Sequence, residues 1–221
     1  MKPGIILALS VALSLTACAQ RTNSGHSGGT PSALKPLSQT ARAQLSVATF
    51  AAGCFWHEEG LFETIKGVKD VESGYAGGTA ANPTYERVET GATGHAETVN
   101  VYYDPKEISF AQLLQVYFAG EDPTQVNGQG NDMGTQYRSI VFYRTPAEKT
   151  AIDAAIASVK SQYKKPIAVQ VMPFTKFWMA EDYHQNYIPA HTNEGYVQYC
   201  IREIQSTQAK MPNMVKPGFK Y

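Results

Sequence analysis

The sequence carries no excess of charge of either sign. Nineteen Lys and Arg residues balance nineteen Asp and Glu residues, and no long run of basic residues occurs. A nucleic-acid-binding protein needs a concentrated basic surface, so this pattern argues against that class of partner. The 221 residues, of which 43% are hydrophobic, are enough to bury one core, and we expect one compact domain.

Cysteine is scarce as well, with three residues in the whole chain. They form no C-x-x-C pair, and no pair of histidines stands near Cys54 or Cys200 at the spacing of metal ligands. We therefore expect no zinc or iron site. The sequence also has no phosphate-binding loop, and no cofactor is expected.

The first eighteen residues differ in composition from the rest. Lys2 is followed by an apolar run from Ile5 to Leu15 and then by "LTAC". The run is too short to span a bilayer and is typical of a secretory signal. Because "LTAC" resembles a lipoprotein cleavage motif, we predict that residues 1–18 are a lipoprotein signal ending at lipidated Cys18. The alternative is a plain secretory signal in which Cys18 is incidental.

The lipid would anchor an exported protein to a membrane, facing the periplasm or the cell surface. Residues 19–44, rich in Ser, Gly, Thr and Pro, are predicted to be a flexible tether. The folded domain should then cover residues 45–205, and a loosely ordered tail residues 206–221. With Cys18 assigned to lipid, Cys54 and Cys200 remain, and the default interpretation is that they form a structural disulfide.

Cys54 is placed at a junction between a strand and a helix. "SVATFAAG" has the composition of a strand and ends in Gly53, and "CFWHEEGLFETIKG" has helical spacing of its apolar residues. The first turn of a helix stabilises an anion, so a thiolate is favoured there. His57, three positions into the helix, is expected to point to solvent.

Strands and helices are mixed along the rest of the chain without a regular repeat. This order predicts an α+β fold, with helices packed on one small mixed sheet, and an irregular structure after residue 173. The strands are expected within 46–53, 70–78, 96–105, 137–144 and 167–173, and the helices within 54–67, 83–90, 109–119 and 145–163.

Successive motifs give the chain a family resemblance that covers roughly residues 49–196. It resembles the peptide methionine sulfoxide reductases of the A type, which implies a ferredoxin-like core and reduction of methionine S-sulfoxide. The motifs are "GCFW" at 53–56, "GYAGG" at 74–78, "NPTYERVETGATGHAETV" at 82–99, "YDP" at 103–105, "DPT" at 122–124, "QGNDMGTQYRS" at 129–139 and "YHQNY" at 183–187.

The resemblance implies a role for five polar residues. Cys54 attacks the sulfoxide sulfur and becomes a sulfenic acid. Glu97 supplies the proton that the oxygen needs, for which burial must raise its pKa. Tyr85 and Tyr137 donate hydrogen bonds to the oxygen, and Asp132 positions a water molecule.

The resemblance also implies a substrate pocket. Phe55 and Trp56 form an apolar wall for the methyl group on the substrate's sulfur; without the resemblance, a place in the ordinary core at the head of a helix is an equal alternative. His184 lines the site, and Tyr187 and Tyr196 lie near its rim.

Cys200 is predicted to resolve the sulfenic acid through a Cys54–Cys200 disulfide. Family members often carry such a cysteine in a mobile C-terminal "GYC" segment; here Val197 takes that position, and Cys200 follows three residues later. The alternatives are a structural thiol, or resolution by an external thiol. The expected reductant is a thioredoxin-like protein of the same compartment. The expected substrate is oxidised proteins or free methionine sulfoxide, and the protein is expected to be a monomer.

The chain departs from the family at four positions and leaves two other classes of function open. His57 and Glu58 stand where Gly and Val are usual, and Glu121 and Gly128 stand where His and Arg are usual. A cysteine hydrolase would use Cys54 with His184 and Asp132. A tethered binding module would use "CFW" as an apolar recognition patch.

Overall fold

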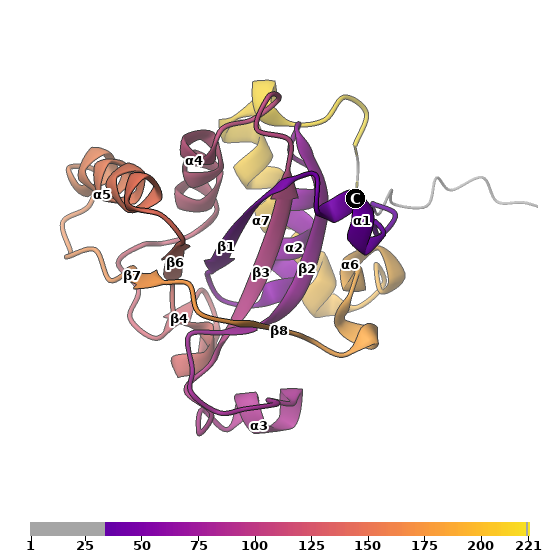
Figure 1. The fold of residues 1–221 in the computed structure, drawn as a ribbon, viewed down its shortest axis with the longest axis vertical. Helices are drawn as coiled ribbons and strands as arrows, with labels where there is room; N and C mark the ends of the chain where they lie inside the picture. The colour runs from indigo at the N-terminus through magenta and orange to yellow at the C-terminus, as the bar shows by residue number, and fades with distance from the viewer. Residues whose placement is uncertain (1–33, 220) are drawn as a thin grey trace, which may run out of the picture.

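A six-stranded mixed sheet forms the centre of the protein, in the strand order β7-β6-β1-β3-β2-β8 (Figure 1). The computed structural model describes residues 34–219 and 221, so the predicted signal, Cys18 and the first part of the predicted tether lie outside the described residues. All strand pairs of this sheet are antiparallel except β6 with β7. The strands are β1 (Ser46–Ala51), β2 (Val68–Ala76), β3 (Ala96–Tyr103), β6 (Ile140–Tyr143), β7 (Gln170–Pro173) and β8 (Phe177–Met179).

The four central strands have a ferredoxin-like arrangement. Helix α2 (Phe55–Glu63) connects β1 to β2, helix α4 (Phe110–Gly120) lies between β3 and β6, and the order β6-β1-β3-β2 places the first strand between the fourth and the third. The predicted α+β fold with this core is therefore confirmed. The smaller elements are α1 (Gln39–Arg42), α3 (Tyr85–Glu89), α5 (Pro146–Lys160), α6 (Tyr187–Ala190), the pair β4 (Gly128–Gln129) and β5 (Asp132–Met133), and the 3-10 turns η1 (Thr135–Tyr137), η2 (Asp182–His184) and η3 (Pro212–Met214).

The core lies between the sheet and the helices α2, α4 and α7 (Gly195–Lys210), which cover one of its faces (Figure 1). Phe50 of β1 stacks on Phe62 of α2, with ring centroids 5.1 Å apart, and on Tyr117 of α4 at 5.3 Å. Such aromatic pairs stabilise the core beyond the area that they bury. This packing holds α2 against β1, and Cys54 lies in the short connection between these two elements.

The C-terminal part of the chain is more regular than predicted. Helix α7 has 16 residues and extends past residue 206, and an isolated bridge joins Ile65 to Val215. The Tyr221 hydroxyl donates hydrogen bonds to Glu63 Oε2 at 2.9 Å and to the Gly60 carbonyl at 3.1 Å. The prediction of a loose tail was wrong because these contacts hold the segment against the end of α2.

The predicted tether also ends earlier than expected, because residues 34–44 belong to the folded part. Arg42 at the end of α1 forms ion pairs with the buried Asp70 and Glu72 of β2, the first with Nε to Oδ2 at 2.6 Å. The backbone N–H of Leu37 also donates to Asp70 Oδ2, at 3.0 Å. The folded domain therefore begins before Leu45, since β2 needs this segment to satisfy its carboxylates.

Arg42→Ala is expected to destabilise the fold by about 2–4 kcal/mol, because it leaves two buried carboxylates without their partner. Arg42→Lys keeps the charge but loses the planar fork, so a smaller loss is expected. Urea unfolding at neutral pH checks both variants. Equal stability of Arg42→Ala and wild type would show that α1 is not tied to the sheet through these charges.

Candidate active site

The strand-to-helix junction at Cys54 depends on Gly53. This glycine has φ +81, and a Cβ at its position would lie 2.7 Å from Gln129 Cβ, so any larger residue would be strained and would clash. Cys54 then takes the N-cap position of α2, and its carbonyl accepts hydrogen bonds from the backbone N–H of His57 at 3.1 Å and of Glu58 at 3.3 Å. The predicted placement of Cys54 is confirmed.

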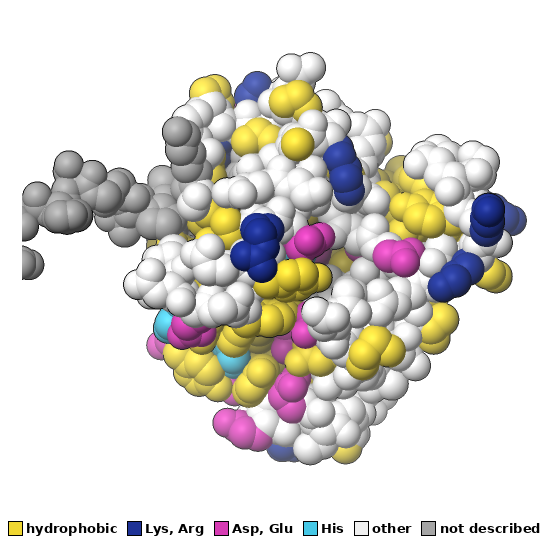
Figure 2. Space-filling model, turned by 180° about the vertical axis from the view of Figure 1, so that it is seen from behind, with side chains coloured by type: hydrophobic (Ala, Val, Ile, Leu, Met, Phe, Trp, Pro, Cys, Tyr) yellow, Lys and Arg dark blue, Asp and Glu magenta, His cyan; other side chains and the backbone are white. Residues whose placement is uncertain are grey.

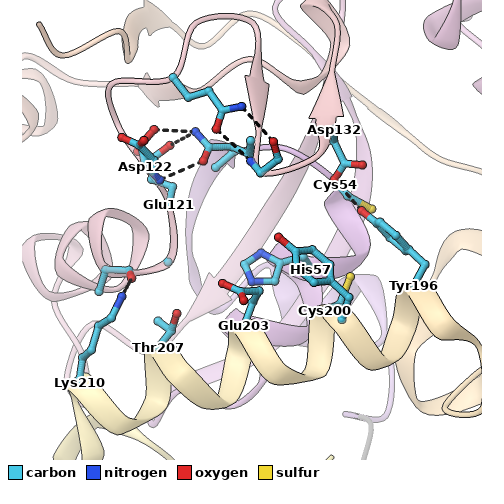
Figure 3. A pocket seen from close by; sticks show the side chains of 17 residues that line it. Cys54, His57, Glu121, Asp122, Asp132, Tyr196, Cys200, Glu203, Thr207 and Lys210 are labelled. Atoms are coloured by element: carbon cyan, nitrogen blue, oxygen red, sulfur yellow. Dashed lines mark hydrogen bonds between the residues drawn. The ribbon is translucent and has the colours of Figure 1, made fainter. Parts of the chain in front are cut away.

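Cys54 forms part of the wall of two separate cavities. A cavity of about 230 Å³ is lined by Cys54, Phe55, Trp56, Tyr85, Glu97, Asp132, Tyr137 and Tyr196. A second cavity of about 370 Å³ is shared by Cys54 with Cys200, His57 and the C-terminal end of α4 (Figure 3). From the side opposite to Figure 1, the surface shows hydrophobic side chains gathered with acidic side chains and histidines among them (Figure 2).

The smaller cavity brings together most of the residues predicted for substrate binding and catalysis. Glu97 lies on β3, is 2% exposed, and accepts a hydrogen bond from the backbone N–H of Phe55 to Oε2 at 2.9 Å. Burial raises the pKa of Glu97 well above its usual value, and the bond from Phe55 opposes this only in part. A neutral carboxyl can donate a proton near neutral pH.

Two tyrosine hydroxyls face the same space. Burial raises the pKa of Tyr85 and of Tyr137, and both therefore keep their protons as hydrogen-bond donors. The Tyr137 hydroxyl donates to Glu89 Oε2 at 3.0 Å. Glu89 was missed by the sequence analysis, although it stands one helical turn after Tyr85 on α3, the spacing at which two side chains share a face.

Glu181 is a second residue that the sequence analysis missed. Its carboxylate accepts hydrogen bonds from the Tyr75 hydroxyl at 2.8 Å and from the backbone N–H of Tyr85 at 3.0 Å. It therefore holds the first residue of α3 against strand β2. No motif around Glu181 indicated this contact, which depends on the return of the chain after β8.

Trp56 is held by residues that were predicted to touch substrate. Its ring stacks on Tyr187, with centroids 3.6 Å apart and planes 3° apart, and its Nε1 donates to His184 Nδ1 at 3.1 Å. His184 is 1% exposed, and neither His184 nor Tyr187 is among the residues that line the cavity. In this structure His184 and Tyr187 contact Trp56 and hold its ring in place.

Tyr196, at the start of α7, connects the two cavities. Its hydroxyl donates to Asp132 Oδ2 at 2.6 Å, and the residue lines both spaces. Asp132 is thus held by Tyr196 and is not paired with His184. The hydrolase alternative, which required Cys54, His184 and Asp132 to act together, gains no support from this arrangement.

Both cysteines of the described chain are free and buried, Cys54 being 8% and Cys200 1% exposed. Burial raises the pKa of Cys54 well above its usual value, Glu97 adds to this, and the Tyr196 hydroxyl opposes it. Burial thus opposes the thiolate that the helix terminus favours at Cys54 in the substrate-free site. Burial likewise raises the pKa of Cys200 to about 12.

Two further expectations about this region need correction. Cys200 lies in the middle of α7, not in an irregular segment, because its apolar neighbours at helical spacing pack against α2 and α4. His57 points into the larger cavity and not to solvent, since its Nδ1 lies 3.3 Å from Oε1 of the buried Glu58.

A buried thiol, a neutral carboxyl and two hydroxyl donors around an aromatic wall, on a ferredoxin-like α+β domain, define an oxidoreductase that works through cysteine. Residues 46–215 match the family model described as peptide methionine sulfoxide reductase. The chain belongs to this family, and its activity is the reduction of peptide methionine sulfoxide.

Individual relatives agree with this family. The chain is 49% identical over 146 residues to "Peptide methionine sulfoxide reductase MsrA" of Acidobacterium capsulatum, covering 65% of this chain and 94% of the relative. It is 46% identical over 167 residues to "Peptide methionine sulfoxide reductase MsrA 2" of Synechocystis sp., covering 74% and 78%.

Solved structures show the same fold. Reduced Mxr1 of Saccharomyces cerevisiae is 32% identical, with a TM-score of 0.64 over 69% of this chain and 88% of that one. Methionine sulfoxide reductase A of Corynebacterium diphtheriae is 33% identical, with a TM-score of 0.62 over 69% and 79%.

Proposed function

We propose that the protein reduces methionine S-sulfoxide, free or in proteins, by direct attack of the Cys54 sulfur on the sulfoxide sulfur. The observation that carries this proposal is the placement of a buried nucleophile and a buried neutral acid in the wall of one cavity, Cys54 and Glu97. A sulfoxide needs both, because its sulfur accepts the nucleophile only as its oxygen gains a proton.

The substrate's methyl group is held against Phe55 and Trp56, and sulfur beside aromatic rings makes a favourable contact. The sulfoxide oxygen then faces the hydroxyls of Tyr85 and Tyr137, whose hydrogen bonds stabilise the charge that develops on it. These four residues line the same cavity as Cys54.

The first step transfers the oxygen from methionine to the enzyme. The Cys54 sulfur bonds to the substrate's sulfur while Glu97 protonates the oxygen, and the thiol proton replaces the one that Glu97 has given. The sulfur–oxygen bond of the substrate then breaks and the oxygen passes to the Cys54 sulfur as a hydroxyl group. The bond between the two sulfurs breaks at the same time, so that methionine leaves and Cys54 is oxidised to a sulfenic acid. One thiol and one sulfoxide are thus converted to one sulfenic acid and one thioether. Asp132 orders water in this cavity.

The second step forms a disulfide between Cys54 and Cys200 and releases water. Both residues border the larger cavity, and Cys200 is the second cysteine of the described chain. A thioredoxin-like protein then reduces this disulfide by thiol–disulfide exchange. Cys200 is buried in α7, so the first turns of this helix must open before that exchange can occur.

We also propose that the protein works outside the cytoplasm, as a monomer anchored through lipid on Cys18. The residues "LTAC" after a short apolar run support this location. A reductant of the same compartment then takes the place of cytosolic thioredoxin. Labelling with a radioactive fatty acid in the wild type and in Cys18→Ser tests the anchor; label in Cys18→Ser would contradict it.

Incubation with a peptide containing methionine S-sulfoxide and dithiothreitol, followed by quantification of methionine, tests the activity. We expect release from the S epimer and not from the R epimer, and no release from either would contradict the proposal. Cys200→Ser is expected to release one methionine per chain without reductant, but to lose at least about tenfold in turnover with a thioredoxin-like donor. Equal turnover of Cys200→Ser and wild type with that donor would exclude Cys200 as the resolving thiol.

A further inference from the structure

The larger cavity contains polar groups that the reduction of the sulfoxide does not use. It is lined by Cys54 together with Cys200, His57, Glu121 and Glu203, among others, and Glu97 is not among its lining residues (Figure 3). Two buried polar atoms on its wall, His57 Nε2 and Glu121 Oε1, have no hydrogen-bond partner among the described residues. A buried polar atom without a partner is costly, and a catalytic role is one reason for such an atom to persist.

His57 of α2 and Cys200 of α7 lie on neighbouring turns of these two packed helices. A Cβ at Gly60 of α2 would lie 3.0 Å from Ile204 Cδ1 of α7. His57 stands three residues before Gly60 and Cys200 four residues before Ile204, so each lies one turn earlier on the same face of its helix. Figure 3 shows the side chains of His57, Glu203 and Cys200 in the wall of the same cavity.

Cys200 needs a base in this cavity if it is to attack Cys54. Only the thiolate is an effective nucleophile, and burial holds Cys200 in the thiol form near neutral pH. Histidine is the side chain that exchanges protons most readily in this range. His57 has a free Nε2 and is oriented through Nδ1 by Oε1 of the buried Glu58 at 3.3 Å. With the proton on Nδ1, Nε2 is left as the acceptor.

The carboxyl groups of the cavity are poorer candidates. Burial raises the pKa of Glu121 well above its usual value, so it is neutral, and Ser139 Oγ already donates to its Oε2 at 2.5 Å. Asp132 is occupied by the Tyr196 hydroxyl. Glu203 is exposed, and hydration stabilises its charge.

We propose that His57 takes the proton of Cys200 while the Cys200 sulfur attacks the Cys54 sulfenic acid from the larger cavity. This inference rests on the proposed function, in which Cys54 forms that acid. His57 is a further residue of the resolution step, and Glu58 is its positioning residue.

Cys54 lines both cavities. The bond between the two sulfurs forms where Cys54 and Cys200 line the larger cavity, and the sulfur–oxygen bond breaks where Cys54 and Glu97 line the smaller one. The hydroxyl leaves as water with the proton of Glu97, and His57 holds the proton of Cys200. The Cys54 sulfur is reduced as the Cys200 sulfur is oxidised. His57 and Glu97 then restore their proton balance by exchange with water.

A single-turnover experiment on the full-length chain separates the two steps. Reduced enzyme is mixed with a methionine S-sulfoxide peptide and no other reductant. Methionine release is followed together with the Cys54 sulfenic acid, trapped by dimedone, and the disulfide, detected by mass spectrometry. In His57→Ala, the rate of disulfide formation relative to the rate of methionine release is expected to fall about 10²-fold, and the dimedone adduct should accumulate.

Added imidazole is the decisive part of the test. It is expected to restore disulfide formation in His57→Ala and to have no effect in Cys200→Ser, because the cavity of about 370 Å³ can admit it where the side chain has been removed. Thr207→Val changes another residue of the same wall and is expected to leave the ratio of the two rates unchanged. If His57→Ala does not fold, His57→Asn takes its place in the ratio measurement.

An unchanged ratio in the His57 variant, or a reduced ratio that imidazole does not restore, would overturn the inference. The failure of the proposed function has a different signature, since wild type would then release no methionine. Release without a Cys54–Cys200 disulfide in wild type would remove Cys200 as the resolving thiol and this inference with it, while attack by Cys54 would stand.

Discussion

Cys54→Ser is expected to release no detectable methionine from a methionine S-sulfoxide peptide, a loss on the order of 10⁴-fold or more. The serine hydroxyl is a weak nucleophile, and it cannot take the sulfoxide oxygen to form a sulfenic acid. The remaining cavity would still bind the substrate, because its aromatic wall and its tyrosine donors are intact. The measurement is methionine released over hours with excess dithiothreitol.

Folding of this variant is expected to be close to that of wild type. Sulfur and oxygen differ little in size, and the side chain at the N-cap of α2 makes no capping hydrogen bond, so the thermal midpoint should shift by no more than a few degrees. Cys200→Ser is the matched control, because it removes the other buried thiol and is expected to keep the first turnover. Methionine release by Cys54→Ser would contradict the assignment of Cys54, and failure of both variants would indicate a folding defect.

The sequence pattern was sufficient to predict the strand-to-helix junction that carries Cys54. Gly53 between a small-residue strand and a helix with regular apolar spacing is a local signal, and the structure shows both elements and the positive φ of Gly53. Local signals also predicted α4 and α5 to within three residues at each end, because Ser109 and Thr145 begin capping boxes.

Helix α7 was missed although its pattern was present. Val197, Cys200, Ile201 and Ile204 repeat at helical spacing and are buried, but polar residues dominate the segment and Glu194 is a weak N-cap. Its stability comes from packing against α2 and α4, which no local pattern reveals. The end of the tether was misplaced for the same reason. Arg42 is held by Asp70 and Glu72 of β2, and the local sequence around Arg42 does not reveal these contacts.

The ionisation states within the site depended on distances that the sequence does not contain. The helix terminus alone predicts a thiolate at Cys54, but the fold buries this sulfur and brings Glu97 of β3 close to it. Burial disfavours the charged form of both groups, and Glu97 adds to this effect at Cys54, so both favour the neutral form in the empty site. Entry of a sulfoxide changes this balance, because the oxygen accepts the proton of Glu97 as the thiol loses its own.

Glu97→Gln is expected to lower the rate of methionine release by about 10²–10⁴-fold, the usual contribution of a general acid. The glutamine has the same shape, and its carbonyl oxygen can still accept the bond from the backbone N–H of Phe55, which Glu97 accepts at 2.9 Å. It has no proton to give to the sulfoxide oxygen. Single-turnover kinetics without reductant measure this step apart from the resolution by Cys200.

The pH dependence has a defined direction. In wild type, Glu97 must be neutral to give its proton. Burial raises the pKa of Glu97 well above its usual value, so the neutral form persists to higher pH. The first-turnover rate should therefore be retained across neutral pH and should fall as the pH rises through that raised pKa. Glu97→Gln is expected to lack this alkaline decline, and the same decline in both proteins would assign it to another group.

The substitution Glu97→Gln should affect stability in the opposite direction to activity at alkaline pH. The folded protein binds the proton of Glu97 more tightly than the unfolded chain does, so the contribution of this group is complete below the ordinary pKa of 4.5 and is lost as the pH rises through the raised value. Glu97→Gln carries no such loss, and its unfolding free energy relative to wild type should increase from about pH 5 to about pH 9. Urea unfolding at both pH values measures the difference. A variant that is slower in catalysis but more stable at alkaline pH would show that the fold keeps a buried carboxyl for its proton, at the expense of stability.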